Sequence, residues 1–178
     1  MKPAIKASIP IVILAIVVGF LYWKLTEGNP INPERIVAGD SFFYSQGRCF
    51  GACPMFEITV RSDDSYFYNG QGFVGKEGVW EGSFSEGRYR SIMALLEKYD
   101  FASLLDHYGW NGDAGGSVCG NIATDMPDYQ IKLKSRRLTK QVYYYEGCMD
   151  FADEARLKAL IADLQDTVDL NYWLDPAD

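Results

Sequence analysis

The sequence is poor in the residues that catalytic and nucleic-acid-binding sites commonly use. His107 is the only histidine in 178 residues, and 24 Asp and Glu outnumber 17 Lys and Arg, which gives a formal net charge of −7. An acidic chain is a poor match for a phosphate backbone, so we expect no nucleic-acid partner. The one basic cluster fits the solvated face and tip of a hairpin and consists of Lys132, Lys134, Arg136, Arg137 and Lys140.

Internal repeats, low-complexity tracts and the sequence motifs of common serine and zinc hydrolases are also missing. Hydrophobic residues make up 48% of the chain and aromatic residues 15%, which excludes a disordered polymer. A chain of 178 residues is long enough for one domain with its own core and too short for two ordinary ones.

One long apolar run is present, at residues 7–23, between Lys6 and Lys24. It is just long enough to span a bilayer, and neither a small-x-small cleavage pattern nor a lipid-modifiable cysteine follows it. Lys2 and Lys6 place the N-terminus on the cytoplasmic side. We expect an uncleaved transmembrane signal-anchor over residues 1–25 in the inner membrane, a linker over 26–34 and a periplasmic or extracellular domain over 35–178. A cleaved signal peptide, which would also export the domain, is the alternative.

Patterns after the linker predict an antiparallel meander followed by a hairpin. Residues 36–44 and 55–60 predict two strands, and a third begins at Tyr66 after a turn at 62–65. Residues 69–72 predict another turn, and residues 73–84 predict one or two further strands with bulges. Residues 128–134 and 138–145 predict the hairpin, in which Ile131 faces Val142 and Tyr129 faces Tyr144.

Apolar residues at helical spacing predict two helices. The first covers residues 86–98 behind a sequence that resembles a capping box, Ser83 to Glu86. The second covers residues 151–169, with Asp150 as its cap and an apolar stripe of Leu157, Leu160, Ile161, Leu164 and Val168. The predicted fold is α+β: an antiparallel sheet with two helices packed on one face, preceded by one N-terminal transmembrane helix.

Four cysteines fall in two local groups, Cys49 with Cys53 and Cys119 with Cys148. An exported domain favours disulfides, but four cysteines allow three pairings and the sequence alone does not choose among them. In the structural interpretation, one pair closes a small loop and the other pins a glycine-rich loop to the hairpin. The alternative is a Cu(I) or thiol-redox site at Cys49 and Cys53, because neighbouring thiolates suit soft metals and exchange chemistry. The sequence after Pro54 predicts a strand and not an activating helix N-terminus, so we expect no metal and no cofactor.

Residues 106–125 show no periodicity, are rich in glycine and form the candidate binding loop. Its polar candidates are Asp106, His107, Asp113 and Asp125. An acid–base pair of His107 with Asp106 or Asp125 makes a hydrolase the second alternative. The spacing of the aspartates fits no EF-hand. Aromatic faces on the strands are further candidates for contact with a sugar or a protein, namely Tyr66, Tyr68, Tyr143 and Tyr145.

The motif Cys49-Phe50-Gly51-x-Cys53-Pro54, the Thr124-Asp125-x-Pro127 element and the C-terminal helix resemble a bacterial envelope family catalogued as domain of unknown function 6438. The resemblance covers residues 36–173. Met55-Phe56 and the Cys119/Cys148 pair depart from the family's pattern. The resemblance implies a secreted or membrane-attached protein and carries no established activity.

These patterns favour a binding protein over an enzyme. We expect a non-catalytic, membrane-anchored extracytoplasmic module that is stabilised by disulfides. Its sheet face or its 106–125 loop would contact an envelope protein or a glycan. Thiol or copper handling and hydrolysis are the alternatives.

Thiol labelling in intact cells tests the predicted compartment. We expect a maleimide reagent to modify none of the four cysteines until a reductant is added, because paired sulfurs carry no thiol. Mass mapping of the labelled chain checks this. Four free sulfurs on the cytosolic side would contradict both the export and the disulfides.

Overall fold

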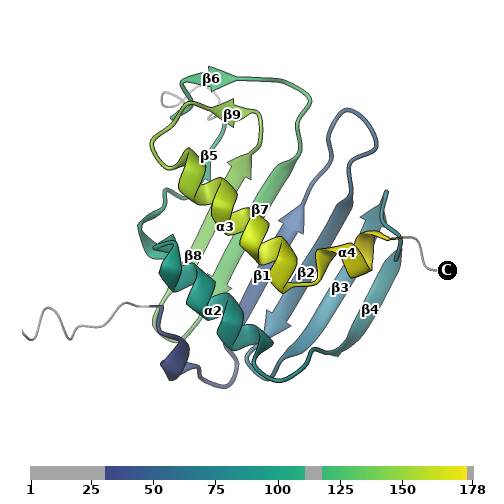
Figure 1. Cartoon of the computed structure of the whole chain (residues 1–178), viewed down its shortest axis with the longest axis vertical. Coiled ribbons are helices and arrows are strands. Elements are labelled where there is room, and N and C mark those ends of the chain that lie inside the picture. The colour runs from purple at the N-terminus through teal and green to yellow at the C-terminus, as the bar shows by residue number, and fades with distance from the viewer. Residues whose placement is uncertain (1–30, 111–117, 176–178) are drawn as a thin grey trace, which may run out of the picture.

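The computed structural model describes residues 31–110 and 118–175 (Figure 1). The predicted anchor over residues 1–25 and Asp113 of the predicted loop lie outside these residues. In the described ranges, no helix has the length and apolar character needed to cross a membrane.

A mainly antiparallel sheet of seven strands, in the order β4-β3-β2-β1-β7-β8-β5, is the centre of the domain (Figure 1). Only β5 and β8 pair in parallel. The strands are β1 (Ser41–Gln46), β2 (Met55–Arg61), β3 (Ser65–Gly72), β4 (Gly78–Ser83), β5 (His107–Tyr108), β7 (Asp128–Lys134) and β8 (Thr139–Tyr145). A separate two-stranded sheet pairs β6 (Asn121–Ile122) with β9 (Cys148–Met149).

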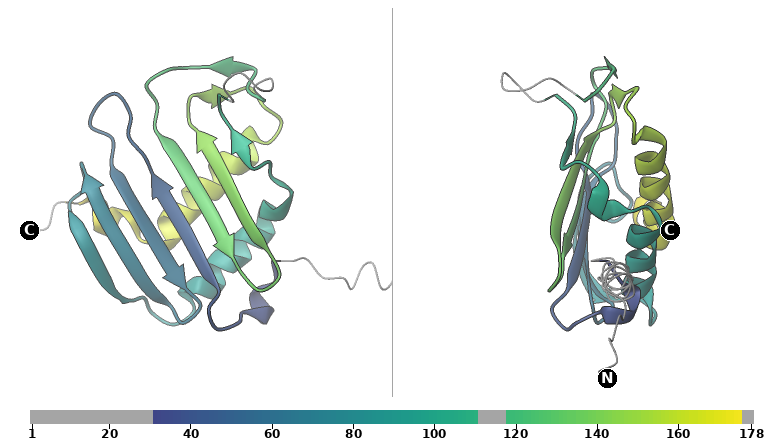
Figure 2. Two further views of the ribbon diagram at one scale, coloured as in Figure 1. Left: turned by 180° about the vertical axis from the view of Figure 1, so that it is seen from behind. Right: turned by 90° about the vertical axis from the view of Figure 1, so that its left-hand side faces the viewer.

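Helices α2 (Arg88–Lys98) and α3 (Glu154–Thr167) both cover one face of the large sheet and leave the other face open (Figure 2). The short helix α4 (Leu170–Leu174) continues from α3, and two 3-10 turns, η1 (Pro33–Arg35) and η2 (Phe101–Ser103), flank α2. The predicted α+β class, with an antiparallel meander, a later hairpin and two helices on one face, is confirmed.

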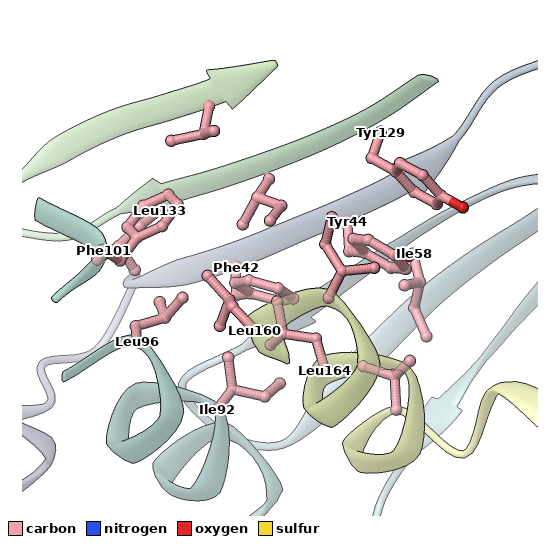
Figure 3. Packing of buried hydrophobic residues seen from close by; sticks show 14 of the residues in the cluster. Phe42, Tyr44, Ile58, Ile92, Leu96, Phe101, Tyr129, Leu133, Leu160 and Leu164 are labelled. Atoms are coloured by element: carbon pink, nitrogen blue, oxygen red, sulfur yellow. The ribbon is translucent and has the colours of Figure 1, made fainter. Parts of the chain in front are cut away.

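The core lies between the helices and the sheet. Phe42, Tyr44 and Ile58 point from the strands toward Leu160 and Leu164 of α3 (Figure 3). All five residues of the apolar stripe predicted for the second helix are buried. In the hairpin, the predicted pairs of Ile131 with Val142 and of Tyr129 with Tyr144 are confirmed.

The first strand begins at Ser41, later than the predicted start at residue 36. The delay is due to Asp40, a buried carboxylate that accepts hydrogen bonds from the backbone N–H groups of Val37 and Arg136. A buried carboxylate must be satisfied in this way, and the interaction closes a turn at residues 37–40 before the strand can start.

The predicted turn at residues 69–72 was wrong, because these residues continue β3 past a bulge between Met55 and Phe56 of β2. The chain reverses over residues 73–77 and forms a single further strand, β4. Gly70 permits a close approach there, since a Cβ atom would lie only 2.1 Å from the carbonyl oxygen of Lys76. The glycines therefore serve strand packing and not the turn.

Both helices start later than predicted, and their caps differ from the predicted ones. For α2, Asp64 of the β2–β3 turn accepts hydrogen bonds from the N–H groups of Gly87 (2.8 Å) and Tyr89 (2.7 Å). A side chain distant in sequence thus takes the role predicted for Ser83. For α3, Asp150 was the predicted cap, but its backbone N–H donates a hydrogen bond to the carboxylate of Glu154. Asp150 thus acts here as a donor and not as the acceptor expected of a cap.

Replacing Asp64 tests this tertiary cap. Asp64→Asn keeps the left-handed backbone conformation at φ 63° but removes one acceptor oxygen, and we expect it to lower the free energy of unfolding by about 1 kcal/mol. Ser83→Ala, which removes the predicted cap, should change it by less than about 0.5 kcal/mol. Urea unfolding measures both values. A larger loss for Ser83→Ala than for Asp64→Asn would show that Ser83, and not Asp64, caps α2.

Candidate functional site

The strand register gathers the loops of the domain at two opposite ends of the sheet. Gln46 at the end of β1 pairs with Phe56 and Tyr129, and Tyr145 at the end of β8 pairs with Asp128. The connections at this end are residues 47–54, 73–77, 123–127 and 146–147 (Figure 1). We call it the cystine end, because both disulfides lie there. The opposite end holds the turns at residues 37–40, 62–64 and 135–138.

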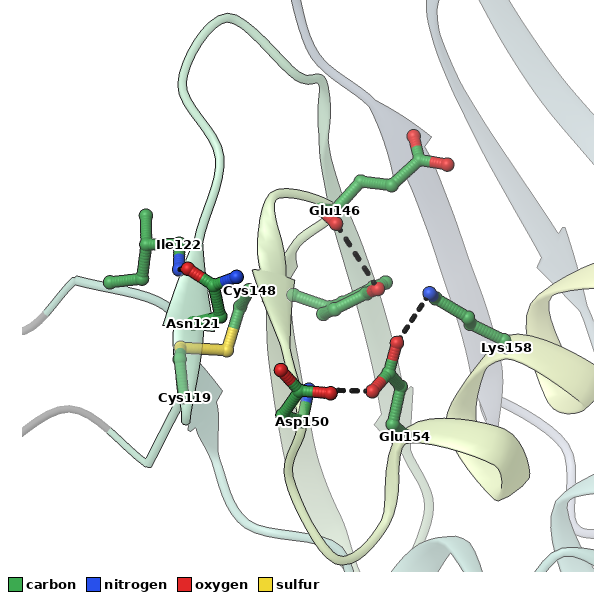
Figure 4. Close-up of a disulfide and its surroundings, with 9 residues drawn as sticks. Cys119, Asn121, Ile122, Glu146, Cys148, Asp150, Glu154 and Lys158 are labelled. Carbon is green, nitrogen blue, oxygen red and sulfur yellow. Dashed lines mark hydrogen bonds and ion pairs between the residues drawn. A yellow bond between two sulfur atoms is a disulfide. The ribbon is translucent and has the colours of Figure 1, made fainter.

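The cysteines pair within their local groups, as the structural interpretation predicted. Cys49 and Cys53 are joined across four positions, with a Cα–Cα distance of 5.8 Å, in the β1–β2 connection. Cys119 and Cys148 are joined across 29 positions and link the segment before β6 to β9 (Figure 4). Cys148 is fully buried, whereas the sulfurs of the smaller ring lie at the surface loop.

For the alternative of a copper site at Cys49 and Cys53, the described residues offer no third ligand. Both Cys49 and Cys53 are oxidised, and no group of three His, Cys, Asp or Glu residues suited to a metal ion occurs among the described residues.

Asp106 and His107 lie at the edge of the sheet and not in an irregular loop. The Asp106 carboxylate pairs with the ammonium group of Lys140 at 2.5 Å, and Lys140 also donates to the carbonyl oxygen of Leu104. His107 belongs to β5 and stacks on Tyr143 with ring centroids 4.7 Å apart. Its Nε2 atom is buried and has no hydrogen-bond partner among the described residues.

Asp125 lies near the Cys49–Cys53 ring, where its carbonyl oxygen accepts a hydrogen bond of 3.1 Å from the N–H of Phe50. Its carboxylate accepts from the hydroxyl of Thr124. Both aspartates predicted as partners of His107 therefore make other interactions. The acid–base pair that a hydrolase would need is not formed in this arrangement.

The tyrosines predicted as an exposed aromatic surface divide between the two faces of the sheet. Tyr68 is fully buried beneath the helices, and Tyr66 packs on Phe84 and Trp173 of the same layer. Tyr143 and Tyr145 lie half-buried on the open face. The period of two along a strand decides this division, which the sequence alone could not orient.

Large apolar side chains are exposed at the cystine end. Phe50 is 87% exposed, Trp110 73%, Phe73 59% and Met126 39%. These four residues, which we call the apolar rim, come from the ends of four different strands. The backbone N–H of Phe50 donates to the carbonyl oxygen of Asp125, the residue before Met126. Phe50 and Met126 belong to the connections of the neighbouring strands β1 and β7, whereas Phe73 and Trp110 lie toward opposite edges of the sheet. Exposed aromatic and Met side chains are typical of protein interaction surfaces.

Sequence reasoning missed the rim. The signal that could have revealed it is Phe50, an aromatic residue in the short loop between Cys49 and Cys53. A residue in such a loop has no strand or helix face on which it could be buried.

A cavity of about 250 Å³ lies beneath α3 near the cystine end and is lined by polar groups of both layers. Gln165 donates to the hydroxyl of Tyr44, and the Tyr129 hydroxyl donates to Glu146. Burial, reinforced by the Glu146 carboxylate, raises the pKa of Tyr129. These phenols stay protonated at neutral pH, so the cavity supplies hydrogen-bond donors and no phenolate base.

The two disulfides differ in the length of chain that they close, and their removal tests this difference. In the chain-entropy model, Cys119→Ala/Cys148→Ala should lower the free energy of unfolding by roughly 3 to 4 kcal/mol, and Cys49→Ala/Cys53→Ala by about 2 kcal/mol. Urea titration of each double variant measures the loss. An equal or reversed order would contradict the view that the larger ring supports the fold.

Comparison with known proteins places this domain in a family. No curated protein matches the chain. A family model described as "Domain of unknown function (DUF6438)" matches residues 40–168, which include the seven strands of the large sheet, α2, α3 and both disulfides. The match spans most of the chain, so this protein belongs to the family DUF6438.

Proposed function

We propose that this protein is a non-catalytic binding module, anchored in a membrane by residues 1–25, that contacts a partner protein outside the cytoplasm through the apolar rim. The observation that carries the proposal is Phe50, which is 87% exposed inside a ring closed by a disulfide. The partner has an apolar patch for Phe50 and Met126 with polar groups around it, because Arg48 and Asp125 are exposed in the same two connections.

The small disulfide ring supports this role because it adds little to the core. Cys49 and Cys53 lie in a surface connection, and the ring and the hydrogen bond from the Phe50 N–H to the Asp125 carbonyl oxygen restrain the backbone that carries Phe50. A side chain that is ordered before binding loses less conformational entropy in a complex. A buried aromatic anchor surrounded by weaker contacts is the usual source of binding energy in an interface.

The position of the first described residues relative to the rim also supports the proposal. Ile31, the first described residue, is buried near η1, and the guanidinium of Arg90 in α2 donates to the carbonyl oxygen of Pro33. These contacts lie at the end of the sheet opposite the rim (Figure 1). An N-terminal anchor would therefore hold the opposite end near the bilayer and direct Phe50 away from it.

Site-specific cross-linking tests the proposal in cells that express the full chain. A photoreactive benzoylphenylalanine at position 126 should form one discrete adduct with a second protein. Adding Phe50→Ser should reduce the adduct about tenfold, because it removes the aromatic anchor. Gel mobility and mass spectrometry of the adduct measure both.

The matched control carries the same photoreactive residue at Arg61, an exposed position at the opposite end of the sheet. It should not form this adduct. An adduct that persists with Phe50→Ser, or that forms equally from position 61, contradicts the proposal. An adduct with the mass of two copies of this chain would show that the rim contacts a second copy and not a different protein, which also contradicts the proposal.

A further inference from the structure

A second site lies on the helix-covered face, beside the β3–β4 edge of the sheet. It is a cleft of about 560 Å³ between β3, β4 and the start of α2 on one side and α4 on the other. This volume is within the range of small-molecule binding sites. The cleft shares no residue with the apolar rim.

Aromatic rings form the floor of the cleft. Tyr66 packs on Phe84 with ring centroids 4.8 Å apart, and its ring also meets the edge of Trp173 at 5.3 Å. Tyr172 stands at the mouth, edge-on to Trp173 and more than half exposed. A ligand with an apolar face can therefore lie against rings that the core already holds in place.

The single cation of the lining is already neutralised. Arg88 pairs with Asp169 at 2.8 Å, donates to the carbonyl oxygen of Thr167 and stacks on Phe84 at 4.9 Å. Asp166 also lines the cleft, so two carboxylates face one guanidinium and the lining has a formal charge of −1. Lys76 adds one positive charge at the mouth, where its ammonium group lies 4.3 Å from the centroid of the Tyr172 ring. The lining and its mouth together therefore carry no net charge, which favours a neutral ligand over an anion.

The other polar groups of the lining both donate and accept hydrogen bonds. They are the hydroxyls of Ser83, Ser85, Tyr66 and Tyr172 and the side-chain amide of Asn171. The Asp166 carboxylate adds acceptors, and no hydrogen bond or ion pair engages it within the described ranges. Sugar hydroxyls donate and accept, whereas an ammonium group only donates.

We infer that this cleft binds a neutral saccharide of roughly one or two rings, with its apolar face on the aromatic floor and its hydroxyls bonded to Asp166, Asn171 and the serines. The site would give the protein a glycan contact beside β3 and β4. It is independent of the proposed protein contact, which lies at the cystine end.

Calorimetric titration of the full chain, kept in a polyoxyethylene detergent that carries no sugar head group, tests the inference. The probes are cellobiose, maltose and N,N′-diacetylchitobiose, with putrescine and citrate as cationic and anionic comparators. We expect at least one disaccharide to bind and both comparators to give no heat. Asp166→Asn should weaken that binding about fivefold, as the loss of one hydrogen bond predicts.

Tyr172→Ala should also weaken the binding, because it removes one side of the mouth. Glu81→Gln is the matched control: it removes one negative charge from the open face of the sheet, where Glu81 pairs with Phe67, and should leave the affinity unchanged. Circular dichroism confirms that each variant is folded. Binding of putrescine alone, no saccharide binding, or equal affinity in all variants would overturn the inference.

Discussion

A row of packed aromatic rings across one face of the sheet is the constraint on which the rest of the structure depends. Neighbouring strands contribute Tyr68, Phe56, Tyr44 and Tyr129 with centroid distances of 5.8 to 6.3 Å, and Trp173 closes the row at 4.2 Å from Tyr68. The pleat directs all of the strand residues in the row to the same face. So much apolar surface on a single face must be covered, and α2, α3 and α4 supply the cover.

The hydroxyls of the buried tyrosines restrict how α3 can lie on the sheet. A buried hydroxyl needs a partner, and Gln165 of α3 supplies one for Tyr44 while Asp153 accepts from Tyr108 at 2.7 Å. A shift of α3 along the sheet would break both bonds at once. Tyr68 lacks such a partner among the described residues, and burial raises its pKa to about 12. The packing of the Tyr68 ring on Trp173 stabilises this part of the core in spite of the unsatisfied hydroxyl.

The cystine end of the sheet and the cleft beside β3 and β4 are left for recognition. At the cystine end, disulfides hold loops that have too few apolar contacts of their own, and this lets Phe50 stay exposed without disordering its loop. At the opposite end, Asp40 and Asp64 perform a similar task through hydrogen bonds to distant backbone N–H groups. A rigid scaffold with functional groups on its end loops is a common division of roles in small domains.

The sequence by itself determined the class of the fold, the register of the β7–β8 hairpin and the buried stripe of α3, because each follows from local periodicity. Only the tertiary structure decided which end of the sheet carries the exposed aromatics, how the aspartates pair and which residue caps α2. These depend on contacts between residues far apart in sequence, such as Asp64 with Gly87, Asp106 with Lys140 and Asp125 with Phe50. Local patterns contain no information about such partners, so the functional surfaces emerged only when the strands were assembled.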